Sequence, residues 1–263
     1  MALYYDDFSM NNANPPTTAS ILAIGDSWFW YPFPGGSLLN NIDLLTRQKQ
    51  HTILAKGNNG AEVFDYVHGV YERQVSTALK LYGWGLSAVL ISGGGNDFAG
   101  FNDLRPLLKD NCAGAASASD CFKVGTDGLS QFLRDVDANF RTLIGRIYTH
   151  TNLNCMVFMH TYDYAIPDGR PVFRNGKAWL KPALDDAQVP AALQQACVIY
   201  LMDRFYATLK SICALDPQHL FVVDSRGTLG PSDWANELHP KSFGFGKIVK
   251  QRWEPMLVAN NLA

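Results

Sequence analysis

Two hydrophobic periods divide the chain into segments. Short apolar runs bounded by turn residues predict five strands, near residues 20–25, 51–55, 87–92, 153–160 and 219–223. Apolar residues that recur every three or four positions predict helices near residues 37–48, 61–82, 126–149, 190–214 and 242–258. No internal repeat is visible. Strands that alternate with helices along a whole chain predict an α/β fold, with a parallel sheet and helices on both faces.

The alternation predicts one domain over residues 20–263. Residues 1–19 show neither period and lack the basic and apolar blocks of a secretory signal, so we expect a flexible arm that ends at Pro15 and Pro16. Three stretches interrupt the pattern: the aromatic residues 28–36, and insertions at 98–125 and 161–189, the last with a predicted hairpin turn at Asn175-Gly176. All three follow strands, so we expect them to gather at the carboxyl edge of the sheet.

Composition narrows the class of protein. Of the 263 residues, 47% are hydrophobic and 17% are charged, which is typical of a globular protein. The net charge of −2 argues against nucleic acid or an anionic membrane surface as a partner. No apolar run reaches the length of a membrane span. The sequence leaves the oligomeric state open.

The five cysteines give conflicting indications about the redox state and the compartment of the protein. Cys155, Cys197 and Cys213 fall on apolar strand or helix positions, where buried thiols are expected. Cys112 and Cys121 bracket a small polar loop, and that spacing predicts a disulfide when the protein is oxidised. The missing signal favours the cytoplasm by default, whereas this pair suggests export by a non-classical route. No Cys-x-x-Cys pair or histidine cluster is present, so we expect neither a metal site nor a cofactor.

The first predicted strand runs directly into Gly25-Asp26-Ser27. A serine there lies at the carboxyl edge of the sheet, where α/β proteins bind their ligands. Two interpretations are open at this point: Ser27 is a nucleophile, or Asp26 and Ser27 cap the next helix.

A serine nucleophile needs a base, and six histidines could provide one. His51 and His219 begin strands at the opposite edge, and His68 and His150 lie in or beside helices. His160 ends a strand at the correct edge. His239 lies in Asn236-Glu237-Leu238-His239-Pro240, on the loop after the fifth strand, and we favour it over His160.

Two glycine-rich turns follow the second and third predicted strands, at residues 57–61 and 92–97. Glycine lets backbone amides approach a ligand, and the side chain of Asn96 can donate a hydrogen bond beside them. These turns could supply donors for a developing oxyanion, although each alone could be a tight strand-to-helix connection.

Taken together, these motifs resemble those of the SGNH, or GDSL-type, hydrolase superfamily. The resemblance extends from Gly25-Asp26-Ser27 through Gly57–Gly60 and Gly94–Asp97 to His239-Pro240. It implies a three-layer flavodoxin-like sheet of order 2-1-3-4-5, with Ser27 and Asn96 flanking the switch point between strands one and three. It also implies hydrolysis of an ester or thioester through an acyl-enzyme, with Gly60 and Asn96 as oxyanion donors.

The chain departs from this pattern at Asn236, where the superfamily usually has an acid. An asparagine carbonyl can hold the imidazole tautomer but provides no charge to stabilise imidazolium. Three explanations remain open: a Ser27–His239 dyad oriented by Asn236, a substitute acid (Glu237, Asp233 or Asp163), or a protein without catalysis.

The sequence thus favours a serine esterase that acts on a lipid-like or aromatic acyl ester. Ser27 would attack, His239 would transfer the proton, and the Ser27 amide, Gly60 and Asn96 would bind the oxyanion. The aromatic loop is expected to line the acyl pocket with Trp28, Phe29, Trp30 and Phe33. The alternatives are a glycan O-acetyl esterase and a non-catalytic binding module.

Overall fold

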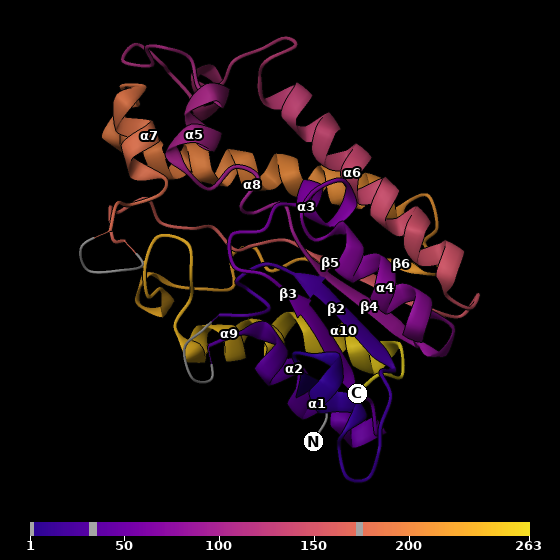
Figure 1. Ribbon diagram of the computed structural model, residues 1–263. Helices are drawn as coiled ribbons and strands as arrows, with labels where there is room; N and C mark the ends of the chain where they lie inside the picture. Colours follow the sequence, from indigo (N-terminus) through magenta and orange to yellow (C-terminus); the bar gives the residue numbers. More distant parts are fainter. Residues whose placement is uncertain (1–2, 32–35, 172–175) are drawn as a thin grey trace.

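One sheet of six parallel strands organises the molecule. The computed structural model describes residues 3–31, 36–171 and 176–263. The strand order is β1-β3-β2-β4-β5-β6 (Figure 1). The strands are β1 (Leu3–Tyr4), β2 (Ile21–Gly25), β3 (Ile53–Gly57), β4 (Ala88–Ser92), β5 (Met156–His160) and β6 (Leu220–Val223). Strands β2 to β6 are the five expected ones, and their order is the flavodoxin-like 2-1-3-4-5.

The centre of the sheet aligns the turns that carry the motifs. Strands β2 and β4 are buried along their whole length, which suits their almost entirely apolar sequences. In the parallel ladders, Gly25 at the end of β2 pairs with Gly57 on one side and Ser92 on the other. A Cβ on Gly25 would lie 2.6 Å from Ser92 Cβ, so glycine is needed for this approach. The three turns therefore start side by side at one edge.

Helices cover both faces of the sheet, as Figure 1 shows. One face carries α3 (Val63–Val67), α4 (Glu72–Tyr82), α6 (Leu129–His150) and α8 (Ala191–Cys213). The other carries α2 (Leu38–Thr46), α9 (Ser242–Ile248) and α10 (Glu254–Ala259). None of the helices in the described ranges combines the length and apolar character required to cross a membrane.

The amino-terminal segment differs from the flexible arm that we expected. Strand β1 pairs with β3 as a sixth strand, and α1 (Asp7–Asn11) follows it. Met10 on this helix is fully buried. A two-residue strand and a five-residue helix are too short to produce a readable hydrophobic period, which explains why the sequence pattern missed them.

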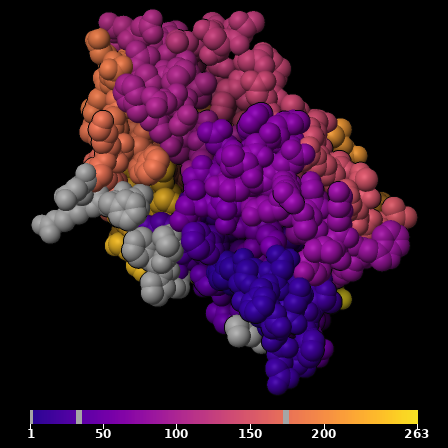
Figure 2. Space-filling model, viewed as in Figure 1, coloured from indigo at the N-terminus to yellow at the C-terminus, as the bar shows by residue number. Residues whose placement is uncertain are grey.

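Two expected helices are also divided. Residues 61–82 form α3 and α4 with a break between them, and the last helix consists of α9 and α10 joined by a π-helical segment, Val249–Trp253. The two long insertions contain α5 (Phe101–Leu104) and α7 (Lys181–Asp186), which contact each other. In Figure 2 the orange segment around α7 lies against the magenta segment around α5. Asn175 of the expected hairpin turn lies outside the described residues.

Candidate active site

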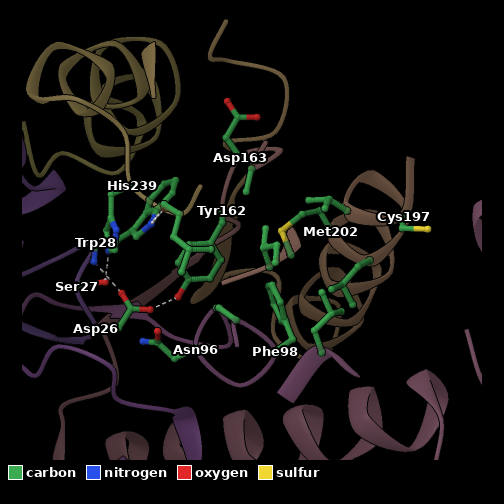
Figure 3. A pocket seen from close by; sticks show the side chains of 18 of the residues that line it. Asp26, Ser27, Trp28, Asn96, Phe98, Tyr162, Asp163, Cys197, Met202 and His239 are labelled. Carbon is green, nitrogen blue, oxygen red and sulfur yellow. Dashed lines mark hydrogen bonds between the residues drawn. The ribbon is translucent and has the colours of Figure 1, made fainter. Parts of the chain in front are cut away.

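The turn after β2 presents Ser27. Asp26 Oδ1 accepts the backbone N–H of Trp28 at 3.0 Å, and the Asp26 N–H donates to the carbonyl of Ser92 at 3.1 Å. Helix α2 has its own cap, because Ser37 Oγ accepts the N–H of Asn40. Asp26 and Ser27 therefore do not cap the next helix, and the turn leaves the Ser27 hydroxyl facing the pocket (Figure 3).

His239 is the histidine that contacts Ser27. Ser27 Oγ lies 2.7 Å from His239 Nε2, inside hydrogen-bond distance. His160 instead bonds Ser92 Oγ, on the other side of the turn. The other four have different partners: His51 bonds Ser20, His150 bonds the carbonyl of Arg146, His219 bonds Asp216, and His68 packs against Phe64.

Asn236 orients His239. Its Oδ1 accepts His239 Nδ1–H at 3.2 Å and also the backbone N–H groups of Leu238 and His239, at 2.9 and 3.0 Å. Its Nδ2 donates to the Tyr31 hydroxyl at 3.3 Å. With Nδ1 donating, Nε2 is left as an acceptor for the Ser27 hydroxyl. This is the tautomer that a general base requires.

Tyr31 is a site residue that the sequence reasoning missed. Its ring stacks on the His239 imidazole, with centroids 4.4 Å apart and planes inclined by 19°. It thus contacts the base through its ring and the orienting residue Asn236 through its hydroxyl. The sequence feature that could have identified Tyr31 is its position in the aromatic stretch 28–36, close to the proposed nucleophile Ser27.

The three proposed substitute acids have other roles. Glu237 accepts four backbone N–H groups, from Gly169, Trp179, Leu180 and Lys181. Asp163 accepts those of Tyr164, Gly227, Thr228 and Leu229. Asp233 accepts the Gly230 N–H and pairs with Lys247. Within the described ranges, no carboxylate forms a hydrogen bond with His239 Nδ1, whose partner is Asn236 Oδ1.

Burial sets the electrostatics of the base. His239 is almost completely shielded from solvent, which lowers its pKa to about 4. An imidazole with that pKa is neutral at physiological pH and can accept a proton. Asn236 adds no negative charge that would raise it.

The glycine turns bring Asn96 beside Ser27. Asn96 Nδ2 donates one hydrogen to the carbonyl of Ala61 at 3.0 Å, which ties the turn after β4 to the turn after β3. Asn96 lines the same pocket as Ser27 and His239 (Figure 3). Gly60 has a φ of +76°, a conformation that favours glycine, but it is not among the pocket-lining residues. Across the described part of the chain, the Ser27 and Gly60 amides make no hydrogen bond.

An apolar pocket begins at this site and runs toward α8 (Figure 3). Polar groups of Ser27, Asn96 and His239 lie at one end. The rest of the wall is mainly apolar and includes residues from both insertions and from α8: Phe98, Ala99, Leu104, Phe122, Ala165, Leu180, Leu184, Cys197, Val198, Leu201 and Met202. Within the described ranges, no cluster of three or more histidine, cysteine or acidic side chains could hold a metal ion.

The structure describes three of the four aromatic residues predicted to line the pocket, and of these three only Trp28 lines it, so the prediction is wrong for Phe29 and Trp30. The Nε1 of Trp28 also donates to the Leu238 carbonyl at 3.0 Å. Phe29 is fully buried and packs on His160 and Trp253. Trp30 packs edge-on against Tyr5. Phe33 lies outside the described residues.

Comparison with known proteins supports the fold. No protein-family model and no curated protein matches the sequence. Among solved structures, an extracellular lipase from Streptomyces rimosus is similar over 92% of this chain and 100% of its own, with a TM-score of 0.54 and 16% identity. A phospholipase A1 from Streptomyces albidoflavus NA297 covers 93% of this chain and all of its own (TM-score 0.51, 13% identity). A putative lipolytic protein of the G-D-S-L family from Desulfitobacterium hafniense DCB-2 covers 94% and 100% (TM-score 0.51, 11% identity). The chain has the α/β fold of the SGNH, or GDSL-type, hydrolases.

Proposed function

We propose that this protein is a serine ester hydrolase in which Ser27 and His239 form a dyad oriented by Asn236. The observation that carries the proposal is the 2.7 Å contact between Ser27 Oγ and a neutral, buried His239 Nε2. A hydroxyl becomes a useful nucleophile when an adjacent base can take its proton, and this contact supports that role for His239.

The reaction would proceed through an acyl-enzyme. Ser27 Oγ attacks the carbonyl carbon while its proton moves to His239 Nε2, and the tetrahedral oxyanion is bound by Asn96 with the Ser27 and Gly60 amides. His239 then returns the proton to the leaving alkoxide as the bond from carbonyl carbon to alkoxide oxygen breaks. Water repeats the sequence on the acyl-enzyme and releases the acid.

The pocket supports a substrate with an apolar acyl group. Its wall beyond Ser27 consists mainly of aliphatic and aromatic side chains, which bind hydrocarbon by removing it from water. The solved structures of similar fold include a lipase and a phospholipase A1, which agrees with this substrate class. We therefore place lipid-like or aromatic acyl esters ahead of acetylated glycans.

Turnover of p-nitrophenyl acetate, butyrate and octanoate tests the proposal, with Ser27→Ala as the control. We expect kcat/KM to rise with chain length and to fall by several orders of magnitude in Ser27→Ala. A fluorophosphonate should label Ser27 and no other serine. Activity confined to acetate would favour the glycan esterase, and absence of both turnover and labelling would favour a binding module.

The pocket itself can be tested at Met202, which is buried and lines the wall on α8. Met202→Trp should fill the pocket and lower octanoate turnover by about 10-fold or more while acetate turnover changes little, since one bulky contact is worth about 1–3 kcal/mol. Leu209→Phe, buried on the same helix away from the pocket, is the matched control.

A further inference from the structure

A second chain of hydrogen bonds lies behind the nucleophile. His160 Nδ1 lies 2.7 Å from the carbonyl oxygen of Thr161, and His160 Nε2 lies 2.8 Å from Ser92 Oγ. Ser92 Oγ is in turn 2.7 Å from Asp26 Oδ1, and the Tyr162 hydroxyl bonds Asp26 Oδ2. All four side chains are buried, and none of them belongs to the Ser27–His239–Asn236 group.

These four contacts need four hydrogens. Neutral histidine provides one, serine one and tyrosine one, so a chain with an ionised Asp26 has only three. One more proton completes it. On Asp26, this proton lets Oδ1–H donate to Ser92, Ser92 donate to His160 Nε2, and His160 Nδ1–H donate to Thr161. On His160, it gives an imidazolium that donates to Thr161 and Ser92 while Ser92 donates to an ionised Asp26, but that arrangement buries two charges at a cost in free energy. The Tyr162 hydroxyl still donates to Asp26 Oδ2, and Asp26 Oδ1 still accepts the Trp28 N–H.

The other tautomer of His160 does not remove the need for this proton. With hydrogen on Nε2, His160 could donate to Ser92 and Ser92 to an ionised Asp26. The bare Nδ1 lone pair would then face the Thr161 oxygen at 2.7 Å, a buried contact between two acceptors. Such a contact loses a hydrogen bond and adds repulsion.

We propose that Asp26 remains protonated at neutral pH and that Asp26, Ser92 and His160 form an uncharged proton-holding chain behind Ser27. Burial favours this uncharged state over a buried carboxylate–imidazolium pair, because it raises the pKa of Asp26 to about 6 and lowers that of His160 to about 4. Burial alone would leave Asp26 mostly ionised at pH 7. The hydrogen-bonded chain raises the pKa of Asp26 further, since a neutral His160 can accept from Ser92 only when the Asp26 carboxyl is protonated.

Within the described residues, no cationic side chain bonds Asp26. Its carboxyl is faced by Ser92, Tyr162 and the Trp28 amide, and it also interacts electrostatically with Asp97 and the phenol of Tyr66. A negative charge on Asp97 would disfavour a second one on Asp26. His160 is otherwise enclosed by the rings of Trp28, Phe29, Tyr162 and Trp253.

The consequence for Ser27, which rests on the proposed function, is electrostatic. Acyl transfer builds negative charge beside Ser27, one residue from Asp26. A carboxylate in this buried place would oppose that charge, whereas a protonated carboxyl does not. Asp26, Ser92 and His160 are thus positioning residues. Their side chains carry no net charge behind Ser27, so they do not oppose the negative charge of the transition state.

Spectroscopy on the intact protein tests the proton itself. Infrared difference spectra at neutral pH should show the C=O stretch of a protonated carboxyl that shifts with ¹³C-labelled aspartate and disappears in Asp26→Asn; Asp97→Asn separates the second buried carboxyl. The ¹⁵N spectrum should show His160 neutral, with hydrogen on Nδ1. An ionised Asp26, with His160 either neutral or imidazolium, would overturn the proposal.

His160→Phe distinguishes the proton-holding chain from a purely structural role of His160, because only the chain predicts a change in the ionisation of Asp26. Without the His160 acceptor, the Ser92 hydroxyl is free to donate to Asp26, so Asp26 should ionise and its infrared band should vanish at neutral pH. Fluorophosphonate labelling of Ser27 should then slow by about 10-fold as pH rises from 5 to 8, because charge develops behind the nucleophile. Wild type should show no such decline, and neither should Trp253→Phe, which changes packing beside His160 without touching the chain.

The outcomes separate the two proposals. Slower labelling of His160→Phe by the same factor at every pH, or a carboxyl band unchanged by the substitution, would overturn the proton-holding chain. If wild-type Ser27 is not labelled at any pH, the proposed function fails, while the infrared and ¹⁵N spectra still decide the state of Asp26.

Discussion

Asn236 is the residue that most sets this site apart, because it orients the imidazole without providing charge. Three donors converge on its Oδ1, and Tyr31 fixes its Nδ2, so the amide has one orientation. The Nδ1–H tautomer of His239 is therefore maintained. The wrong-tautomer loss that Asp-to-Asn changes cause in triads does not arise here.

Asn236→Asp should keep or raise activity and move its pH dependence. A carboxylate beside Nδ1 favours imidazolium and raises the pKa of His239 from about 4 by one to three units. Since the base works only when neutral, the acid limb of kcat/KM should move to higher pH by the same amount. Asn59→Asp, which adds the same charge on an exposed turn, should leave the limb in place. Loss of activity at all pH values would contradict the neutral-acceptor dyad.

Asn96→Ala should lower kcat by about 10²–10³ with little change in KM, because an oxyanion donor acts mainly in the transition state. Steady-state kinetics on a p-nitrophenyl ester measure both constants. Asn59→Ala is a suitable control, as its side chain is exposed on the neighbouring turn. A change in KM alone would make Asn96 a residue that positions substrate.

At the level of elements, the buried carboxylate of Glu237 holds one segment of the pocket lining in place by hydrogen bonds. Glu237 binds the backbone of Gly169 and of the first turn leading into α7, at Trp179, Leu180 and Lys181. Leu180 and Leu184 of this segment line the pocket. The loop that carries His239 therefore also positions the insertion that shapes substrate access.

Glu237→Gln should loosen this wall. A carboxamide can accept only on its oxygen, so about two of the four charge-assisted bonds are lost, at about 1.5–3 kcal/mol each. We expect a lower midpoint in urea unfolding and a KM for octanoate raised several-fold, with kcat for acetate nearly unchanged. Asp168→Asn, which removes a more exposed carboxylate from the insertion that Glu237 contacts, should affect neither. An equal fall in kcat for both esters would place Glu237 in the chemistry instead.

For the whole molecule, the redox state of five thiols is open to measurement. All five are free in the structure, and Cys112 and Cys121 are both buried. Burial and the neighbouring Cys121 raise the pKa of Cys112 to about 11, so its oxidation should be slow at neutral pH. Under a mild thiol oxidant we expect a Cys112–Cys121 disulfide by peptide mapping, with Cys155, Cys197 and Cys213 still reduced.

Closing so small a loop should raise the free energy of unfolding by about 2.5 kcal/mol if the bridge forms without strain. Thermal unfolding of the oxidised and reduced protein measures the difference, and Cys112→Ser controls for other oxidation. The buried thiol of Cys197 is also close to Cys121. A Cys121–Cys197 bridge would show that spacing in the sequence selected the wrong partner.

The sequence predicted the helices and strands that show a clear hydrophobic period. It also predicted the site residues that lie in a short sequence motif. Strands β2 to β6 were predictable because each strand is an apolar run, and their order was implied by the resemblance to the SGNH hydrolases. Contacts between distant loops were not: Tyr31 over His239 and the amide partners of Glu237 depend on the path of the insertions. Phe29 illustrates the same limit, since an aromatic residue beside a nucleophile can point to either the pocket or the core.

Strand β1 also has a consequence for how copies of this protein behave at high concentration. Without Leu3 and Tyr4, the outer side of β3 would present unpaired N–H and C=O groups, and such a margin invites another molecule to add its own strand. Leu3 and Tyr4 occupy that margin, and Met10 on α1 is buried close behind them. Because so short an edge strand offers few unpaired groups, we expect β1 to make edge-to-edge pairing of copies less favourable.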